Sequence, residues 1–145
     1  MRIVLDDLVT EELKEYLLTQ TGITSVDFSS ENSMTVLDIK YNKKTNSSII
    51  MKYIDLFLNH DYSILFEFDK ETKGKFKTLK YIVDDMCCEY CHSGLVNDLF
   101  ENDNIKSVKS NFNHDMPAYN IEFTIEYDEN YKEEDLIKYI KDKYK

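Results

Sequence analysis

An internal repeat constrains the fold of this chain more than any other feature of its sequence. Residues 39–42 (IKYN) return as residues 125–128 (IEYD), and in both places seven residues lead to a run that ends in Lys-Tyr-Ile, at 50–54 and 136–140. A repeat of this length, in a chain of 145 residues, predicts two copies of one small structural unit.

The spacing between matched positions changes along the chain. Matched residue numbers differ by 86 for residues 39 and 125, by 82 for residues 23 and 105, and by 79 for residues 3 and 82. The second copy therefore has three more residues (82 − 79) between its first strand and its first helix. The three cysteines of the chain lie in this segment.

Hydrophobic periodicity and turn residues predict the order β-α-β-β-α-β in the first copy. The predicted strands of this copy are 2–5, 24–28, 34–41 and 62–68, and the predicted helices are 10–20, with Thr10 as N-cap, and 47–59. The second copy repeats this order with strands at 79–84, 105–112 and 118–127 and helices at 91–101 and 133–143, and then stops. The fold class is therefore α+β, with two tandem sandwiches, of which the second lacks most of its last strand.

The sequence also predicts where the two copies meet. Residues 1–70 form the first copy, the polar and basic segment 71–77 is a linker, and residues 78–145 form the second copy. Because the second copy lacks its last strand, we expect an open sheet edge that the first copy or a second chain covers.

Composition excludes several classes of function. The chain carries 18 basic and 28 acidic residues, a net charge of −10, and such a surface repels nucleic acid. The sequence contains no apolar run of the roughly 20 residues that a membrane helix needs and no secretory signal at its start, so we expect a cytoplasmic protein. We find no catalytic motif, and we expect no enzyme.

The three clustered cysteines, Cys87, Cys88 and Cys91, carry the strongest chemical signal. An odd number of cysteines so close together is not a disulfide framework, which leaves metal or thiol chemistry. Cys88 and Cys91 form a Cys-x-x-Cys pair between a predicted strand and a predicted helix, and the positive end of the helix dipole favours the thiolate, the form that binds metal. Soft sulfur ligands favour Cu(I), Zn(II) and Cd(II), and two sulfurs satisfy a linear Cu(I) centre.

At these residues the chain resembles the heavy-metal-associated domain, the ferredoxin-like module of copper chaperones and metal-transporting P-type ATPases. The loop of that family reads Gly-Met-x-Cys-x-x-Cys, and residues 86–91 match it from Met86 onward, with Asp85 in place of the glycine. The pattern Leu95, Val96 and Leu99 and the segment 105–108 match its first helix and second strand. The resemblance implies a ferredoxin-like fold, metal ligands at Cys88 and Cys91, an inward-packing Met86, and transfer of metal to an acceptor such as a metal-transporting ATPase.

The remaining polar residues near the motif have more ordinary interpretations. A role of Cys87 as a third metal ligand is a hypothesis, because three sulfur ligands suit Zn(II), Cd(II) or a Cu(I) cluster. We expect His92 to be exposed and not a ligand, and His60 and His114 to lie in loops without a role. We interpret Asp84, Asp85 and Glu89 as acidic turn residues exposed to solvent. We expect a packing role in the core for Tyr41, Tyr53, Tyr127 and Tyr139.

Two other functions remain open from the residues alone. A Cys-x-x-Cys pair at a helix start also serves thiol-disulfide exchange, although the order β-α-β-β differs from that of a thioredoxin-like fold. A scaffold for protein contacts without metal is the third interpretation, and it suits the first copy, which contains no cysteine. A homodimer is also possible, formed through the metal loop or through the open sheet edge.

Overall fold

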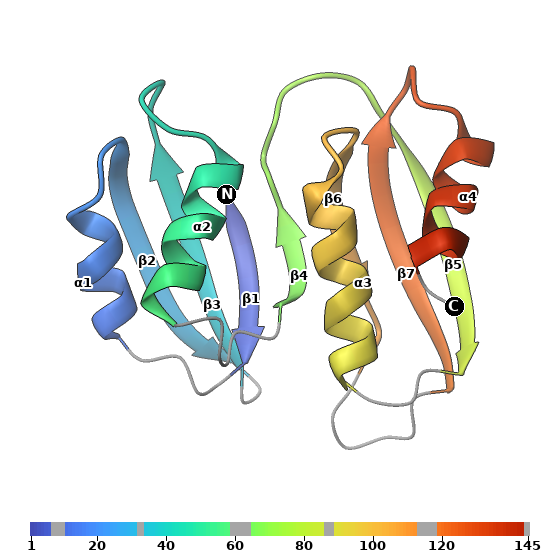
Figure 1. Cartoon of the computed structure of the whole chain (residues 1–145), viewed down its shortest axis with the longest axis horizontal. Helices are drawn as coiled ribbons and strands as arrows, with labels where there is room; N and C mark the ends of the chain where they lie inside the picture. Colours follow the sequence, from blue (N-terminus) through green and yellow to red (C-terminus); the bar gives the residue numbers. More distant parts are fainter. Residues whose placement is uncertain (7–10, 32–33, 59–64, 86–88, 113–118, 144–145) are drawn as a thin grey trace. The chain divides into compact units, whose positions relative to one another are not determined.

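A computed structural model describes residues 1–6, 11–31, 34–58, 65–85, 89–112 and 119–143 (Figure 1). The chain divides into two compact units, Met1–Leu65 (unit 1) and Phe66–Lys145 (unit 2). In the described residues it is a mixed α/β protein with antiparallel strand pairs and four helices. Unit 1 contains β1 (Arg2–Asp6), α1 (Glu12–Leu18), β2 (Ile23–Glu31), β3 (Met34–Tyr41) and α2 (Ser47–Phe57). The other elements are β4 (Leu65–Asp69), β5 (Phe76–Asp85), α3 (Glu89–Glu101), β6 (Ile105–Ser110), β7 (Tyr119–Asp128) and α4 (Glu133–Lys143).

Unit 1 has an antiparallel sheet in the order β2-β3-β1, with α1 and α2 on one face. Alternate residues of β3 are buried, as expected for a strand with one face against helices. Asn46 caps α2, because its side chain accepts a hydrogen bond of 3.0 Å from the amide of Ile49. The core consists of fully buried aliphatic side chains from all five elements, among them Ile3, Leu13, Leu17, Val26, Leu37, Ile39, Ile50 and Ile54.

Unit 2 has a four-stranded antiparallel sheet in the order β4-β6-β7-β5, with α3 and α4 on one face. Its central strand, β7, directs Ile121, Phe123, Ile125 and Tyr127 into the core. These meet the apolar sides of the two helices, which include Leu95, Val96, Leu99, Leu136 and Ile140. The Tyr139 hydroxyl donates a hydrogen bond of 2.6 Å to the carbonyl of Asp98 and so joins α4 to α3.

The strand predicted over residues 62–68, as the last strand of the first copy, is present as β4, over Leu65–Asp69. Within unit 2 it pairs antiparallel with β6 through Phe68 with Val108 and Asp69 with Ser107. Phe68 explains this pairing, because its ring is buried edge-on against Phe100 of α3, with centroids 5.0 Å apart. The sheet of unit 2 thus takes its fourth strand from the chain before the predicted linker. Among the described residues no strand follows α4, and β5 stays at the opposite edge.

The two units share details of backbone geometry that the sequence repeat does not specify. The ladder between β2 and β3 shifts register between Ile23 and Ser25, and the ladder between β6 and β7 shifts between Ile105 and Ser107, the matched positions. The turns after α1 and α3 also match, because the amides of Ile23 and Ile105 donate to the carbonyls of Gln20 and Asn102.

The same holds for the turns that lead into α2 and α4. The Asn42 amide donates to the Gly22 carbonyl and the Asp128 amide to the Asn104 carbonyl, both over 2.8 Å. The side chains of Asn42 and Asp128 each accept a hydrogen bond from the amide two residues later. The hydrogen bonds follow the same differences of 82 and 86 as the sequence matches, so the two units are built on one backbone plan.

Most predicted elements occur within a few residues of their predicted bounds, and β3 and α4 have the bounds expected. Two helix starts differ. α1 begins at Glu12, with Glu11 at the N-cap and no side-chain capping bond, and Thr10 lies outside the described residues. α3 begins at Glu89, two residues before the predicted start, so Cys91 is the third residue of the helix rather than the first.

Candidate metal-binding site

Cys91 lies in the first turn of α3, just after the junction between β5 and the helix. Its side chain is partly exposed and carries a free thiol in the described part of the chain. Met86, Cys87 and Cys88 lie outside the described residues, as do His60 and His114. Of the three predicted metal ligands, the structure therefore describes Cys91 alone. No group of three or more His, Cys, Asp or Glu side chains that could hold a metal ion occurs among the described residues.

His92 is the residue in this region that the sequence analysis placed wrongly. We expected an exposed side chain, whereas the imidazole of His92 is 0% exposed. The cause is the helical period, because His92, Leu95, Val96, Leu99 and Phe100 follow one another at the spacing of a single helix face. All five side chains are buried. This spacing was visible in the sequence, and it identifies His92 as the first residue of the buried stripe of α3.

The His92 ring lies among aromatic rings from three other parts of unit 2. Its centroid is 5.7 Å from that of Phe66 in β4, 4.6 Å from that of Phe112 after β6, and 5.2 Å from that of Phe123 in β7. These distances are within the range of favourable ring contacts. The first turn of α3 is thus anchored to β4, to β7 and to the segment after β6.

One polar contact accompanies these rings. His92 Nε2 and Ser110 Oγ, at the end of β6, are hydrogen-bonded over 2.6 Å. Ser110 Oγ also accepts a hydrogen bond of 3.4 Å from the amide of Phe112, and the Ser110 amide donates to Glu67 Oε1 over 3.5 Å. The imidazole is therefore buried with a hydrogen-bond partner, as a polar group inside a protein core requires.

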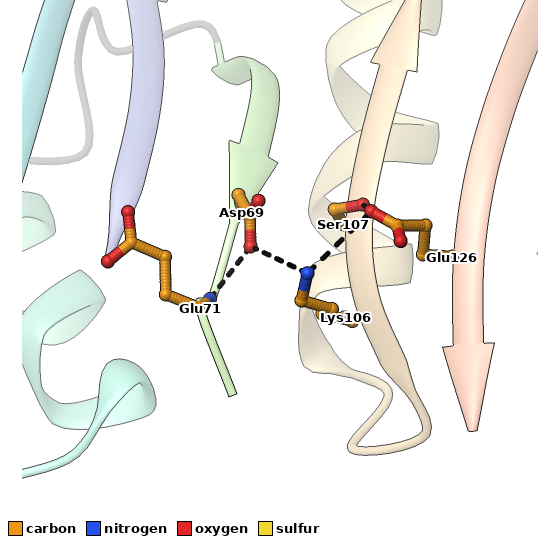
Figure 2. A network of polar contacts seen from close by, with 5 residues as sticks. All are labelled: Asp69, Glu71, Lys106, Ser107 and Glu126. Atoms are coloured by element: carbon orange, nitrogen blue, oxygen red, sulfur yellow. Dashed lines mark hydrogen bonds and ion pairs between the residues drawn. The ribbon is translucent and has the colours of Figure 1, made fainter. Parts of the chain in front are cut away.

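A second polar cluster joins β4, β6 and β7 (Figure 2). Lys106 Nζ lies 3.9 Å from Asp69 Oδ1 and 3.8 Å from Glu126 Oε1, and the Ser107 hydroxyl donates to Glu126 Oε1 over 2.7 Å. Asp69 Oδ1 also accepts from the amide of Glu71 over 2.8 Å. Lys106 is the one cation between two carboxylates here, so this cluster stabilises strand pairing and offers no vacant set of metal ligands.

Lys70, directly after β4, is buried near the C-terminal end of α3. Lys70 as a whole is 6% exposed. Its Nζ donates a hydrogen bond of 3.1 Å to the carbonyl of Asn102 and lies 5.0 Å from the ring centroid of Phe100. Burial lowers the pKa of Lys70 below its ordinary 10.5, and the Asp103 carboxylate opposes this shift. The sequence analysis assigned Lys70 to the first copy and missed this contact.

Burial has the opposite effect on two phenols in unit 2. It raises the pKa of Tyr127, with a smaller contribution from Glu133, and it raises the pKa of Tyr139, with contributions from Asp98, Glu101 and Tyr131. Both tyrosines contribute packing, as predicted from their repeat positions.

Comparisons with known proteins assign no family to the chain. No protein-family model matches it, and no curated protein matches it. Among solved structures, the chain is similar to the solution structure of the N-terminal soluble domains of Bacillus subtilis CopA, at 13% sequence identity and a TM-score of 0.37, over 98% of this chain and 88% of that one. Likeness at this level assigns neither a family nor a function. No helix in the described residues is long and apolar enough to span a membrane.

Proposed function

We propose that the chain binds one soft heavy-metal ion through the thiolates of Cys88 and Cys91 and transfers or buffers it, without catalysis. The observation that carries this proposal is the position of Cys91, whose partly exposed thiol is the third residue of α3. The first turn of a helix carries unpaired amide groups and the positive end of the dipole, and both stabilise a thiolate.

The spacing of the two cysteines supports a shared ion. In the sequence, Cys88 directly precedes Glu89, the first residue of α3, and Cys91 is the third residue of that helix. A Cys-x-x-Cys spacing is the one by which two thiolates commonly bind one metal ion. Two thiols at this spacing suit a single ion at the start of the helix.

Cu(I) is the ion that the donor set fits best, because two thiolates satisfy a linear centre. Zn(II) and Cd(II) are the alternatives. A tetrahedral Zn(II) needs four ligands, and Cys87, a nearby carboxylate or a partner molecule would have to supply the rest. The bound ion is cargo in this proposal, and the acceptor is a metal-transporting ATPase or another metal-binding protein. Bridging of two chains through opposed metal loops is the alternative partner arrangement.

The proposal includes the organisation of the chain as two tandem ferredoxin-like copies, 1–70 and 78–145, joined by 71–77, in a cytoplasmic protein. The matched register shifts and turn hydrogen bonds of the two units support this organisation. The first copy has no cysteine, so we assign it a scaffold role, and only the second copy is assigned metal binding.

Native mass spectrometry of the reduced protein, titrated separately with Cu(I) and Zn(II), tests the proposal. We expect one ion per chain, lost in the double variant Cys88→Ser with Cys91→Ser. The single variant Cys87→Ser is the matched control, since it changes a neighbouring thiol and should retain Cu(I). Unchanged metal binding in the double variant, or no binding in the natural protein, would contradict the proposal, and one ion per two chains would indicate a bridged dimer.

Thiol-disulfide exchange is the competing function of the same two cysteines. The reduction potential of the pair separates the two functions. A potential far below that of the cytosolic glutathione pool, together with no reaction toward protein disulfides, would exclude thiol-disulfide exchange as the function.

A further inference from the structure

We infer that His92 is a positioning residue: its buried hydrogen bond to Ser110, together with its contacts to Phe66, Phe112 and Phe123, fixes the first turn of α3 and thereby the Cys91 thiol. The consequence for metal affinity rests on the function proposed above. The consequence for the helix turn does not, because it concerns the protein without metal.

The argument begins with the instability of helix starts. The first four amides of a helix have no acceptor within the helix, and terminal turns open more readily than central ones. A metal ligand at the third helical residue therefore needs an anchor outside the helix. In the first turn of α3, His92 supplies a hydrogen bond to Ser110 and ring contacts to Phe66, Phe112 and Phe123.

The anchor acts on Cys91 because the two residues are neighbours. Successive residues of a helix are rotated by about 100°, so a helix that directs His92 into the core turns Cys91 toward the edge of the buried face. Cys91 is partly exposed and His92 is fully buried, in agreement with this rotation. Fixing the imidazole fixes the rotation of the helix about its axis, and the direction of the thiol follows.

A hydrogen bond adds what apolar packing alone does not supply. An aliphatic side chain at position 92 would fill the space among the three rings, but it would not select one orientation. The 2.6 Å contact between Nε2 and Ser110 Oγ is directional, and it joins positions 18 residues apart in the sequence. Ser110 is itself held by the Phe112 amide and by Glu67.

Amide hydrogen exchange in the full-length protein without metal tests the inference. The variant Ser110→Ala removes the hydroxyl and leaves His92 Nε2 without this partner. We expect the amides that close the first turn, those of Ser93 and Gly94, to exchange about tenfold faster or more, with little change in α4. Ser110→Thr retains the hydroxyl and should restore the natural exchange rates. His92→Gln, which keeps a polar group near the Nε2 position, should show an intermediate rate.

The matched control is Ile140→Val in α4, which removes one buried methylene group from the same unit. It lowers overall stability without touching the first turn of α3. Selective acceleration at Ser93 and Gly94 in Ser110→Ala, but not in Ile140→Val, is the result expected. Equal acceleration throughout unit 2 in both variants, or no acceleration in Ser110→Ala, would overturn the inference.

Metal affinity, measured by competition with a chromophoric Cu(I) chelator, gives the second measurement. If the natural protein binds Cu(I), Ser110→Ala should bind it about tenfold more weakly, and Ile140→Val should bind it as the natural protein does. Unchanged affinity in Ser110→Ala would overturn the positioning of the thiol. If the natural protein binds neither Cu(I) nor Zn(II) nor Cd(II), the proposed function fails while the exchange result stands, so the two failures are distinguishable.

Discussion

The two units agree closely in their second halves and differ at the junction between their first strand and first helix. From the end of that helix onward, register shifts and turn hydrogen bonds recur at matched positions. The starts of the two helices differ. α1 begins at Glu12 and α3 begins at Glu89. With the difference of 82 between matched residue numbers, Glu89 corresponds to residue 7, so α3 starts five positions earlier than α1. The extra turn of α3 is where Cys91 and His92 lie.

The difference in helix start leaves the buried positions of the two helices matched. The pairs Leu13 with Leu95 and Leu17 with Leu99 are all buried. The three additional residues of the second copy lie before these positions in the sequence. The partly exposed thiol of Cys91 and the buried imidazole of His92 lie in the first turn of α3, and the matched residues of the first copy, Val9 and Thr10, carry neither group.

The largest effect that we predict concerns β4, which pairs with β6 in unit 2. Phe68→Ala removes a buried ring from the contact with Phe100 and should lower the free energy of unfolding by about 3–5 kcal/mol. Because β4 pairs with β6, the loss should fall mainly on unit 2. Hydrogen exchange as a function of urea concentration, resolved by segment, measures this.

The matched control for Phe68→Ala is Leu37→Ala, a truncation in β3 that should affect mainly unit 1. If Phe68→Ala weakened unit 1 as strongly as Leu37→Ala does, β4 would be a functional part of the first copy, as the repeat alone suggests.

The sequence predicted most of the fold because periodicity and turns are local properties. Thr35, Leu37 and Ile39 of β3 are buried, and the residues between them are partly exposed, as expected for a strand with one face in the core. Residues 133–143 form the helix that their periodicity indicates. The pairing of β4 with β6 joins Phe68 to Val108, 40 residues (108 − 68) further along the chain, and no local pattern specifies it. His92 could have been predicted, because it begins a stripe with Leu95 and Val96, but its partner Ser110 could not.

A smaller effect is expected at Gly22, where the units share a hydrogen bond but differ in backbone conformation. Gly22 has a φ of +90°, and a Cβ there would lie 2.8 Å from Thr45 Cγ2 and 3.0 Å from the Thr45 amide nitrogen. Gly22→Ala should therefore lower the free energy of unfolding of unit 1 by about 2 kcal/mol. Thermal or urea unfolding measures the loss.

The matched residue in unit 2 is Asn104, which is not among the described residues with positive φ. Asn104→Gly should change the free energy of unfolding by less than about 1 kcal/mol, because no special conformation is required there. Equal losses in the two variants would show that the shared hydrogen bond, rather than the conformation of Gly22, sets the sensitivity of this turn.

A stabilising change is predicted within the extended helix. Gly94 lies in α3, and a Cβ added there would have no atom within 4 Å. Gly94→Ala should raise the free energy of unfolding by about 0.5–1 kcal/mol, because alanine loses less backbone entropy in a helix. Lys138→Ala, at an exposed position of α4, is the control and should change stability by less than about 0.5 kcal/mol. A loss of stability in Gly94→Ala would mean that α3 needs flexibility at this residue to fold.

The smallest effect is a difference in pH dependence at the other end of α3. The carbonyls of Gln20 and Asn102 both accept from the amide three residues later, but that of Asn102 also accepts from Lys70 Nζ. Because burial lowers the pKa of Lys70, the unfolded chain binds the proton more tightly, and stability should rise with pH between the folded pKa and about 10.5. Lys70→Met should lack this rise.

Urea unfolding of the natural protein and of Lys70→Met, at intervals from pH 7 to pH 10.5, measures the Lys70 contribution as the difference between the two curves. The raised pKa values of Tyr127 and Tyr139 make both proteins lose stability as pH rises above about 10, since the unfolded chain releases these protons first, and this loss cancels in the difference. A difference that stays constant over the whole range would mean that Lys70 titrates alike in the folded and unfolded chains. The buried amine would then be hydrated in solution, and the contact that distinguishes Asn102 from Gln20 would contribute only local geometry.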